Sequence, residues 1–262
     1  MKSFLAPYKP NLDIQQASHL LLSAKHIVAL TGAGISTPSG IPDFRSPGSG
    51  VWEHINPLTV ASLTTFRHHP DQFFEWVRPL AQLIINANPN PAHVALARLE
   101  KNGYLAGVIT QNIDNLHYLA GSEVVFEVHG HMREAVCVSC YRRQPTDDLI
   151  TIFVRTGVIP RCPECNGILK PNVVLIEEQL PYDIFRQAME LIDKSDLILI
   201  VGSSLEVVPV AHLPLDPINA GAHLIIINRE PTYLDERADY IFRQDVASVL
   251  PRLVNEVLGE QE

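Results

Sequence analysis

The sequence predicts an α/β fold, a Rossmann-like doubly wound parallel sheet with two insertions, one helical and one containing all the cysteines. The main observation is a set of short apolar runs that lack the alternation of half-exposed strands, which is typical of strands buried on both faces of a parallel sheet. A polar motif follows each run directly, as expected at the carboxyl edge where such sheets bind ligands. The runs are Ile27–Leu30, Val108–Ile109, Val124–Phe126, Leu197–Val201 and Leu224–Ile227.

The first half of the chain predicts helices around the first two strands. Apolar residues at helical spacing indicate helices over Asn11–Ala24 and Ala92–Glu100. The segment Pro38–Pro47 is dense in Gly, Pro and Ser, which predicts a long loop. Trp52–Ile85 predicts short helices with aromatic anchors, broken at the prolines in positions 57, 70 and 79.

The second half interrupts the sheet and then returns to it. Arg133–Lys170 holds the four cysteines and no long apolar strand, although Asp147–Thr156 indicates one helix. The parallel sheet is expected to resume at Pro171–Ile176, followed by helices over Tyr182–Lys194 and Val246–Leu258. We therefore expect a Rossmann-like domain over 1–132 and 170–262, a helical insertion at about 48–90, and a small module over 133–169.

Composition and charge argue against two classes of partner. The chain of 262 residues carries a formal net charge of −9 and has no Lys/Arg-rich block, so nucleic-acid binding is not expected. No apolar run approaches the roughly 18 residues of a membrane span. The first residues lack the uninterrupted apolar segment of a signal peptide, so we expect a cytoplasmic protein.

The cysteines form two Cys-x2-Cys pairs with metal-ligand spacing. Two such pairs complete a tetrahedral four-sulfur shell around zinc, which leaves no open coordination position and therefore indicates a structural metal. Two disulfides or a redox-active pair are weaker interpretations. Cytosolic thiols stay reduced, and a redox-active Cys-x2-Cys motif does not require a second such motif. The four predicted ligands are Cys137, Cys140, Cys162 and Cys165.

The glycine loop Gly32-Ala33-Gly34 follows the first strand. Such a loop lets the backbone approach a pyrophosphate, and the next helix offers free N–H groups, although a tight turn that serves packing explains the same motif. Position 37 is Thr, so the G-x-G-x-x-G spacing is not met, and no acidic residue lies at the end of a second strand. A classical dehydrogenase is therefore disfavoured.

Two further motifs carry chemically active groups. Gln111–Asp114 supplies amides and a carboxylate that suit a ribose, a carboxamide or an ordered water, while Asn112 or Asp114 also suits a helix cap. His129 follows an apolar run at the same edge, where a neutral imidazole can act as a general base. A lone histidine is more often structural, so each motif is ambiguous by itself.

Taken together, these residues resemble the sirtuin family of NAD-dependent protein deacylases. The resemblance implies a Rossmann domain with a small zinc module, and a cleft between them in which NAD meets an extended acyl-lysine peptide; we expect a monomer. Six motifs match in the family's order and span nearly the whole chain: Gly32–Arg45, Thr110–Asp114, His129-Gly130, the four cysteines, Lys170–Val174 and Gly202–Leu205.

The resemblance also implies the reaction. NAD is consumed as a co-substrate: the acyl oxygen attacks C1′ of the nicotinamide ribose, nicotinamide leaves, and the products are O-acyl-ADP-ribose and free lysine. His129 is implied as the base that activates a ribose hydroxyl. Asn112 positions ribose or water, and Asp114 lines the nicotinamide pocket together with Ile113.

The remaining cofactor contacts are likewise implied by the resemblance. Phe44 is the aromatic shield over C1′ and Gln111 contacts the ribose hydroxyls; the blander roles are a loop anchor for Phe44 and a tight turn at Ser203-Ser204. Phosphate, ribose and nicotinamide contacts fall on Gly32, Ala33, Gly34, Thr37, Asp43 and Arg45. The phosphate and adenosine end falls on Gly202, Ser203, Ser204 and Asn228, with Asp245 and Val246 at the adenine edge.

The expected substrate segment departs from the family pattern. After Lys-Pro-Asn the family reads Val-Val-x-Phe-Gly-Glu, whereas this chain places Ile176 at the aromatic and Glu177 at the glycine. We expect Val174, Ile176, Glu177 and Glu178 to bind an acyl-lysine peptide as an added strand. Glu177 adds charge and bulk where close backbone approach is expected, which weakens peptide binding or retunes it toward basic sequences or other acyl lengths.

The acyl group is expected to be neutral. Sirtuins that remove acidic acyl groups carry Tyr and Arg three residues apart in the helical insertion. Phe74 and Val77 stand at those positions here, and Arg78 is one step away. We therefore expect acetyl or longer neutral chains.

Two other functions fit the same residues. A mono-ADP-ribosyltransferase or NADase on this scaffold is suggested by the altered substrate segment. A non-catalytic NAD-binding module is the other alternative, although a chain without catalysis is free to lose His129, Asn112 and Asp114.

Overall fold

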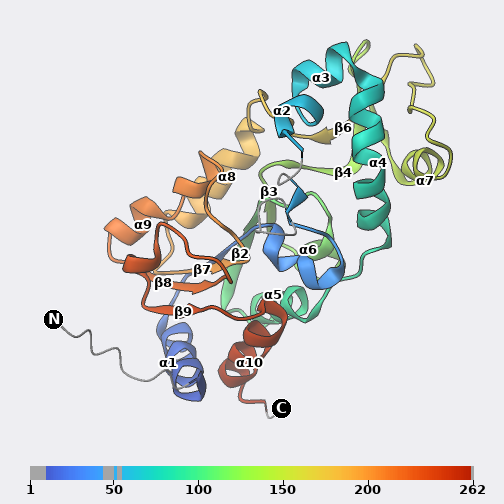
Figure 1. Cartoon of the computed structure of the whole chain (residues 1–262). Helices are drawn as coiled ribbons and strands as arrows, with labels where there is room; N and C mark the ends of the chain where they lie inside the picture. The colour runs from blue at the N-terminus through green and yellow to red at the C-terminus, as the bar shows by residue number, and fades with distance from the viewer. Residues whose placement is uncertain (1–9, 44–49, 52–54, 261–262) are drawn as a thin grey trace.

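The main sheet consists of six parallel strands in the order β3-β2-β1-β7-β8-β9 (Figure 1). The computed structural model describes residues 10–43, 50–51 and 55–260. The sequence predicted the first five of these strands, while the short sixth strand was missed. The strands are β1 (Ile27–Thr31), β2 (Leu105–Thr110), β3 (Val125–Glu127), β7 (Leu197–Val201), β8 (His223–Ile227) and β9 (Tyr240–Phe242).

Helices cover both faces of this sheet, which confirms the doubly wound fold class. Alternate side chains of β1, β7 and β8 pack into two separate cores, one on each face, because successive strand residues point in opposite directions. One core is closed by α1 (Pro10–Ser23), α5 (Pro91–Lys101) and α10 (Val246–Leu258). The other is closed by α8 (Tyr182–Ile192) and α9 (Leu215–Asn219).

The order of the strands determines where a ligand can bind. The chain passes from β1 to β2 and β3 on one side, then returns to β7, β8 and β9 on the other side of β1. Between β1 and β7 the direction of winding reverses, and a crevice forms outside the carboxyl ends of strands at such a point. The loops that follow β1, β2 and β7 therefore converge.

A smaller antiparallel sheet has the order β5-β4-β6. Its strands are β4 (Gly130–Cys137), β5 (Arg143–Pro145) and β6 (Leu169–Val173), and α7 (Asp147–Thr156) follows β5. The expectation that the parallel sheet resumes at Pro171 was wrong, because β6 pairs antiparallel with β4. The sequence Leu-Lys-Pro-Asn-Val is not a continuous apolar run, and three of its five side chains are only partly buried.

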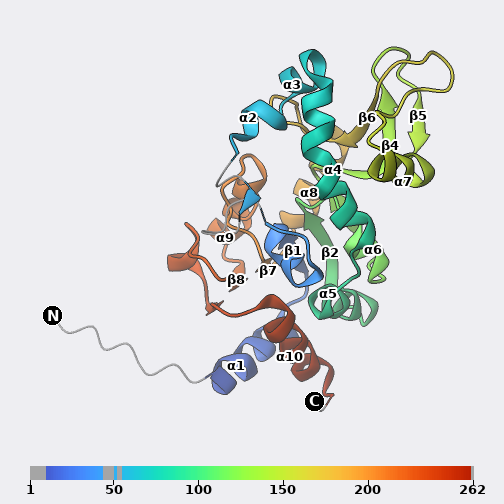
Figure 2. The same cartoon turned by 45° about the vertical axis from the view of Figure 1, so that its right-hand side comes forward.

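The helical insertion packs on this smaller sheet and its helix. It contains α2 (Pro57–Val60), α3 (Leu63–His68) and α4 (Pro70–Asn86), and α4 lies beside α7 in Figures 1 and 2. The two insertions therefore share one apolar core, formed by Phe66, Phe73, Phe74, Val77 and Ala81 together with Phe153, Val154, Val173 and Leu175.

Prolines begin two of these helices, but the expected break at Pro79 was wrong. Pro57 and Pro70 stand in the first turn of α2 and α4, where the missing N–H costs nothing. The helix α4 continues through Pro79. Proline inside a helix costs about 3 kcal/mol. The five large buried apolar side chains of α4 contribute about 1.5–3 kcal/mol each and outweigh that cost.

In the part of the chain that the structure describes, no helix is both long and apolar enough to cross a membrane.

Candidate active site and metal centre

A cavity of about 720 Å³ lies at the carboxyl edge of the main sheet. It extends between the converging loops and the helical insertion, and it brings together most of the residues that the sequence predicted for the site. Those residues are Gly32, Ala33, Gly34, Asp43, Gln111, Asn112, Ile113, Asp114, His129, Val174, Ile176, Glu177, Glu178, Gly202, Ser203, Ser204 and Asn228.

Several predicted residues are not part of this lining. The Thr37 hydroxyl donates to the Gly34 carbonyl at 3.1 Å. Asp245 caps α10 by accepting from the Ala247 N–H at 2.8 Å and also pairs with Arg229, while Val246 is buried in the core below the sheet. Phe44 and Arg45 lie outside the described residues.

The loops after β1 and β7 contact each other backbone to backbone. The Gly34 N–H donates to the Gly202 carbonyl at 2.8 Å. A Cβ atom on Gly34 would lie 2.8 Å from that same oxygen. Gly202 has φ +62°, and a Cβ there would lie 2.2 Å from the Ile35 nitrogen. Only glycine fits these positions, and the resulting open backbone matches what a dinucleotide pyrophosphate needs.

The predicted helix after the glycine loop was wrong. Two short 3₁₀ turns follow instead, η1 (Ala33–Ile35) and η2 (Thr37–Ser39), and Gly40 ends the second in the left-handed conformation. The Gly32 and Gly34 N–H groups are already bonded to the carbonyls of Val201 and Gly202. Among the described residues, Ala33 supplies the one N–H of this three-residue loop that has no partner.

Asp114 is the centre of a buried polar cluster on the cavity wall. It is 6% exposed. The Ser36 hydroxyl donates to its Oδ2 at 2.6 Å, and the Leu116 N–H donates to its Oδ1 at 2.9 Å. The Asn112 amide donates to Ser36 Oγ and to the Gly32 carbonyl, both at 3.1 Å. Asp114 therefore accepts the first N–H of α6 (Leu116–Leu119), whose N-cap position is Asn115, and also lines the cavity, so a helix-start role and a site role are compatible.

Burial raises the pKa of the Asp114 carboxyl. The hydrogen bonds from Ser36 and Leu116 lower it in part, and the negative charge of Glu127 raises it further. A carboxylate with a raised pKa in a cavity is a feature of functional sites.

His129 lies beside this cluster with its ring orientation defined by a backbone carbonyl. Its Nδ1 atom lies 3.1 Å from the carbonyl oxygen of Gln111. Because a carbonyl can only accept, Nδ1 carries the hydrogen, and in the neutral ring the lone pair is then on Nε2. The His129 carbonyl accepts from the Val174 N–H at 2.8 Å, which ties this residue to the predicted substrate segment.

The predicted substrate segment makes one isolated parallel bridge, between Ile176 and Ser62, and then turns, with the Glu178 N–H donating to the Leu175 carbonyl at 3.0 Å. The Ile176 N–H donates to the Ala61 carbonyl at 3.1 Å, and its carbonyl accepts from the Leu63 N–H at 2.9 Å. Glu177 has φ +77°, and its carboxylate accepts from the N–H and hydroxyl of Thr64. Glu178 accepts from the Leu175 N–H and pairs with Lys170 at 2.8 Å.

Two buried histidines lie behind the Asp114 cluster and were given no role by the sequence. His93 and His117 are 0% and 2% exposed, and their rings are 5.0 Å apart. His117 Nε2 lies 2.9 Å from Thr31 Oγ1, and His93 Nδ1 accepts from the Asn90 N–H. Burial lowers the pKa of His93 to about 4 and that of His117 to about 3, so both rings are neutral near pH 7.

The four cysteines form a compact cluster against the smaller sheet. All four sulfur atoms lie within 4.8 Å of one another, with Cys137–Cys165 at 3.4 Å and Cys140–Cys162 at 3.7 Å. A disulfide needs about 2.05 Å, so no pair is bonded. Zn–S bonds of about 2.3 Å in a tetrahedron place sulfurs about 3.8 Å apart, so the cluster fits one zinc ion.

Comparison with known proteins defines the family. A family model described as the Sir2 family matches residues 32–209. A protein of Sulfolobus acidocaldarius named NAD-dependent protein deacetylase is 43% identical over 245 residues, which cover 94% of this chain and 95% of that protein. The chain belongs to the Sir2 family. A Pyrobaculum aerophilum protein named NAD-dependent protein deacylase 2 is 42% identical and covers 91% of this chain and 93% of its own length.

Solved Sir2 structures share the fold of this Sir2-family chain. One described as "Structural Basis for the Mechanism and Regulation of Sir2 Enzymes" gives a TM-score of 0.88 at 41% identity, with 95% of this chain and 99% of that chain covered. One described as "Sir2-p53 peptide-NAD+" gives a TM-score of 0.84 at 39% identity, with 93% and 98% covered. The resemblance predicted from the sequence motifs is therefore confirmed.

The cavity also contains residues that the sequence analysis did not single out. Ser36 was quoted within the glycine motif but received no role, although its hydroxyl joins Asn112 to Asp114. The apolar end of the cavity is formed by one face of α4 together with Ile41. The α4 residues recur at helical spacing, and of them the sequence analysis gave only Val77 a role: Phe73, Trp76, Val77, Leu80 and Ile84.

Proposed function

We propose that this Sir2-family chain is an NAD-dependent protein-lysine deacylase, which yields nicotinamide, O-acyl-ADP-ribose and free lysine. One observation carries the proposal: a single cavity joins the glycine loops, the Asn112–Asp114 cluster, His129 and the Val174–Ile176 segment. The names of the relatives in Sulfolobus acidocaldarius and Pyrobaculum aerophilum agree with this activity.

NAD supplies the reactive bond between nicotinamide and ribose. The facing loops at Gly32–Gly34 and Gly202 support pyrophosphate binding, with the Ala33 N–H as a donor. On this proposal Gln111 and Asp43 contact the ribose side, and Ser203, Ser204 and Asn228 contact the adenosine side. Thr37, Phe44, Arg45, Asp245 and Val246 complete the predicted set.

Three residues are proposed to act on the reacting groups. Asp114 accepts from the nicotinamide carboxamide next to Ile113, and Asn112 positions ribose or water. His129 takes the proton from a ribose hydroxyl through Nε2, since Nδ1 is held by the Gln111 carbonyl. The tautomer set by Gln111 supports this assignment.

The cavity favours neutral acyl groups. The described residues that line it include no Lys or Arg, and its inner end is apolar. Val77 lines the cavity, whereas Phe74 is packed in the shared core of the two insertions. The Arg78 guanidinium donates to the carbonyls of Val154 and Arg155 at 2.9 and 3.1 Å, which directs it toward α7. We therefore propose acetyl and longer neutral chains as substrates, and robust removal of succinyl groups would contradict this.

Zinc is proposed to be structural in this chain. Four thiolates leave no coordination position for substrate, and Cys137 and Cys162 belong to the small core of the sheet β5-β4-β6.

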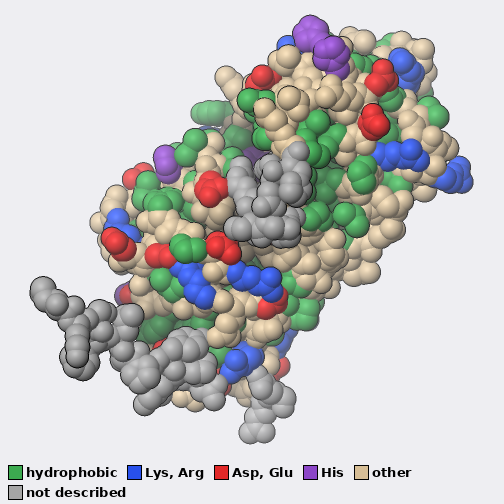
Figure 3. Space-filling model, viewed as in Figure 1, with side chains coloured by type: hydrophobic (Ala, Val, Ile, Leu, Met, Phe, Trp, Pro, Cys, Tyr) green, Lys and Arg blue, Asp and Glu red, His purple; other side chains and the backbone are tan. Residues whose placement is uncertain are grey.

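A cytoplasmic location and a monomeric state stay predictions. On the face shown in Figure 3, Lys and Arg side chains are interspersed with Asp and Glu and form no continuous basic patch.

The experiment that tests this function is nicotinamide release by the purified protein. It is measured with NAD alone, with an unmodified peptide, with an acetyl-lysine peptide and with longer-acyl peptides. Release that requires the acyl peptide supports the proposal and ranks the chain lengths. Release without peptide supports an NADase or ADP-ribosyltransferase, and NAD binding without release supports a binding module.

A further inference from the structure

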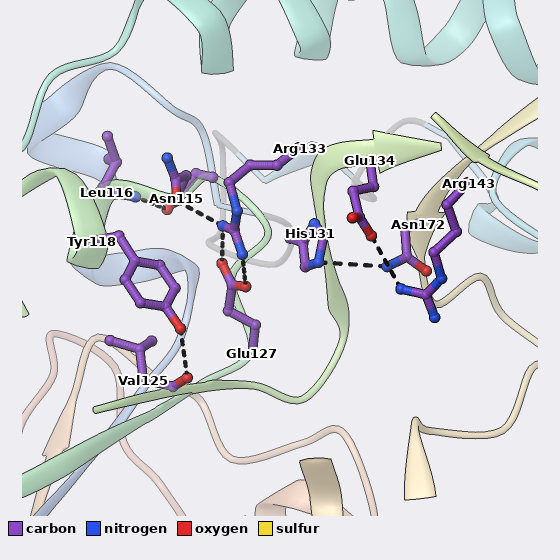
Figure 4. A network of polar contacts seen from close by, with 11 residues as sticks. Asn115, Leu116, Tyr118, Val125, Glu127, His131, Arg133, Glu134, Arg143 and Asn172 are labelled. Atoms are coloured by element: carbon purple, nitrogen blue, oxygen red, sulfur yellow. Dashed lines mark hydrogen bonds and ion pairs between the residues drawn. The ribbon is translucent and has the colours of Figure 1, made fainter. Parts of the chain in front are cut away.

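The Arg133 guanidinium lies where the main sheet meets the smaller sheet. Arg133 is in β4, and its two terminal nitrogens donate to both carboxylate oxygens of Glu127 at 2.7 and 2.5 Å (Figure 4). Nη1 also donates to the Asn115 side-chain oxygen at 2.6 Å. One side chain therefore joins the end of β3, the start of β4 and the loop before α6.

An aromatic ring completes the environment of this guanidinium. Arg133 lies 5.0 Å from the centre of the Tyr118 ring, within the distance of a cation–π interaction. The Tyr118 hydroxyl donates to the Val125 carbonyl at 3.0 Å, so the ring is itself fixed to β3. Figure 4 shows Asn115 and Glu127 directed at the guanidinium and the Tyr118 hydroxyl directed at Val125.

The position of the ion pair in the chain relates it to His129. Glu127 is two residues before His129 and Arg133 is four residues after it. The bidentate pair thus closes a short loop with His129 inside it. The pairing of β4 with β6 is irregular between Gly130 and Ala135, where the Met132 and Arg133 carbonyls accept from Thr146 instead. The Arg133 side chain adds an attachment to β3 and to the loop before α6, which these backbone contacts do not reach.

The third contact relates the loop to the Asp114 cluster. Asn115 directly follows Asp114 and has φ +67°, an uncommon conformation for a residue other than glycine. Its side-chain oxygen accepts from Arg133 Nη1. The same guanidinium therefore fixes the segment that carries His129 and the segment that carries Asn112 and Asp114.

The buried carboxylate makes this contact selective for arginine. Glu127 is 8% exposed, so its charge needs a partner with matched geometry. A lysine keeps the charge but cannot donate in parallel to both oxygens and to Asn115. The Glu127 charge also raises the pKa of Asp114, and Arg133 lies against that charge. The other charged or titratable groups near the pair are His131, Glu134, Arg143 and Glu100.

We propose that Arg133 is a positioning residue that holds His129 in register with Asn112 and Asp114, through Glu127 on one side and Asn115 on the other. The proposal rests on the function proposed above, because it assigns Arg133 to the geometry of that reaction. Arg133 does not line the cavity, so it acts through the residues it holds.

The test compares Arg133→Met and Arg133→Lys with a matched control, Arg143→Met. Arg143 pairs with Glu134 on the same sheet but at the surface, where both side chains are exposed. The double variant Glu127→Gln/Arg133→Met separates positioning from stability, because it leaves no unpaired buried carboxylate. Steady-state deacylation is measured for all variants, with thermal unfolding and with hydrogen exchange of the 128–132 amides in the absence of NAD.

Arg133→Met is expected to lower kcat by about tenfold to a hundredfold, the size of effect that a misplacement of about 1 Å produces. The KM values for NAD and peptide should change by less than about threefold, since the cavity lining is intact. Arg133→Lys should recover part of kcat, and Arg143→Met should match the wild type. The double variant should recover thermal stability but not kcat, and the 128–132 amides should exchange faster in Arg133→Met.

Two results overturn the proposal. One is a kcat for Arg133→Met equal to that of Arg143→Met. The other is a double variant that recovers kcat together with stability, because the loss would then come from the unpaired charge. If the wild type shows no activity that depends on an acyl peptide, the proposed function fails. The exchange of the 128–132 amides still decides whether Arg133 holds the His129 segment.

Discussion

The carboxylate of Glu177 accepts two hydrogen bonds from Thr64, one from the backbone N–H at 3.0 Å and one from the hydroxyl at 2.7 Å. Glu177 has φ +77°, where residues with a Cβ are strained by roughly 1–2 kcal/mol. The two hydrogen bonds from Thr64 act against that strain. The residue that departs from the family's glycine therefore fastens the substrate segment to the first turn of α3.

This relationship predicts how Glu177 affects peptide binding. Glu177→Gly keeps the left-handed backbone accessible but removes the attachment to Thr64, so the KM for an acyl peptide should rise about three- to tenfold, with kcat nearly unchanged. Glu177→Gln retains an acceptor and should stay close to the wild type. Steady-state kinetics with varied peptide at saturating NAD measures both values. An unchanged peptide KM in Glu177→Gly would show that the attachment does not matter.

The buried Asp114 predicts a variant that gains stability and loses function. The pKa of Asp114 is higher in the folded protein than its usual value of 3.8. Asp114 therefore contributes its full stability below pH 3.8, and this contribution is lost as the pH rises through the folded-state pKa. Asp114→Asn should therefore raise the Tm by a few degrees at pH 8, and the gain should shrink toward pH 4. Nicotinamide release should fall at least about tenfold. Thermal unfolding at several pH values tests this prediction. Glu75 is exposed, so Glu75→Gln is the control and its Tm should equal that of the wild type at each pH.

The two buried histidines predict a loss of stability in acid. Their folded pKa values of about 4 and about 3 lie below the usual 6.5, so their contribution is complete above pH 6.5 and is lost as the pH falls. At about 1.4 kcal/mol per unit, the His93 shift corresponds to roughly 3 kcal/mol. His93→Asn should flatten the fall in the free energy of unfolding between pH 6.5 and 4. Urea unfolding at several pH values measures this free energy. His19 is exposed, so His19→Asn is the control, and an equal dependence of the unfolding free energy on pH in the two variants would refute the prediction.

The cysteine cluster predicts one zinc ion for each chain. Purified protein should retain zinc after dialysis, as measured by elemental analysis, and Cys162→Ser should bind far less because one ligand of the shell is lost. A strong chelator should lower the Tm, since metal binding contributes to the folding of small modules. Ser139→Ala is the control, because the Ser139 contact with Cys137 is made by its backbone N–H. Full zinc content in Cys162→Ser would contradict a four-cysteine site.

Local sequence signals were sufficient where one element determines the outcome. The apolar runs that became β1, β7 and β8 are buried along almost their whole length, so periodicity alone predicted them. The helix expected over Asp147–Thr156 has those bounds in the structure, because acidic residues begin it and Gly157 ends it in the left-handed conformation. The spacing of the cysteines also predicted their cluster, because each Cys-x2-Cys pair is a local motif.

Contacts between distant segments were outside the reach of these signals. The pairing of β6 with β4 rather than with the main sheet depends on the path of the chain after Gly130, not on the composition of β6. The Arg133–Glu127–Asn115 contacts likewise join three segments, and none of the three residues stands out in the sequence. The attachment of Glu177 to Thr64 spans 113 positions, so the sequence showed the departure but not its compensation.

On the proposed function, NAD cleavage in this cavity is coupled to removal of an acyl group, with His129 as the base. The most direct measurement quantifies nicotinamide and deacylated peptide in the same reaction, for the wild type and for His129→Ala. We expect about one deacylated lysine for each nicotinamide in the wild type, and loss of the deacylated product in His129→Ala. Nicotinamide formed without deacylated peptide in the wild type, or full deacylation by His129→Ala, would contradict it.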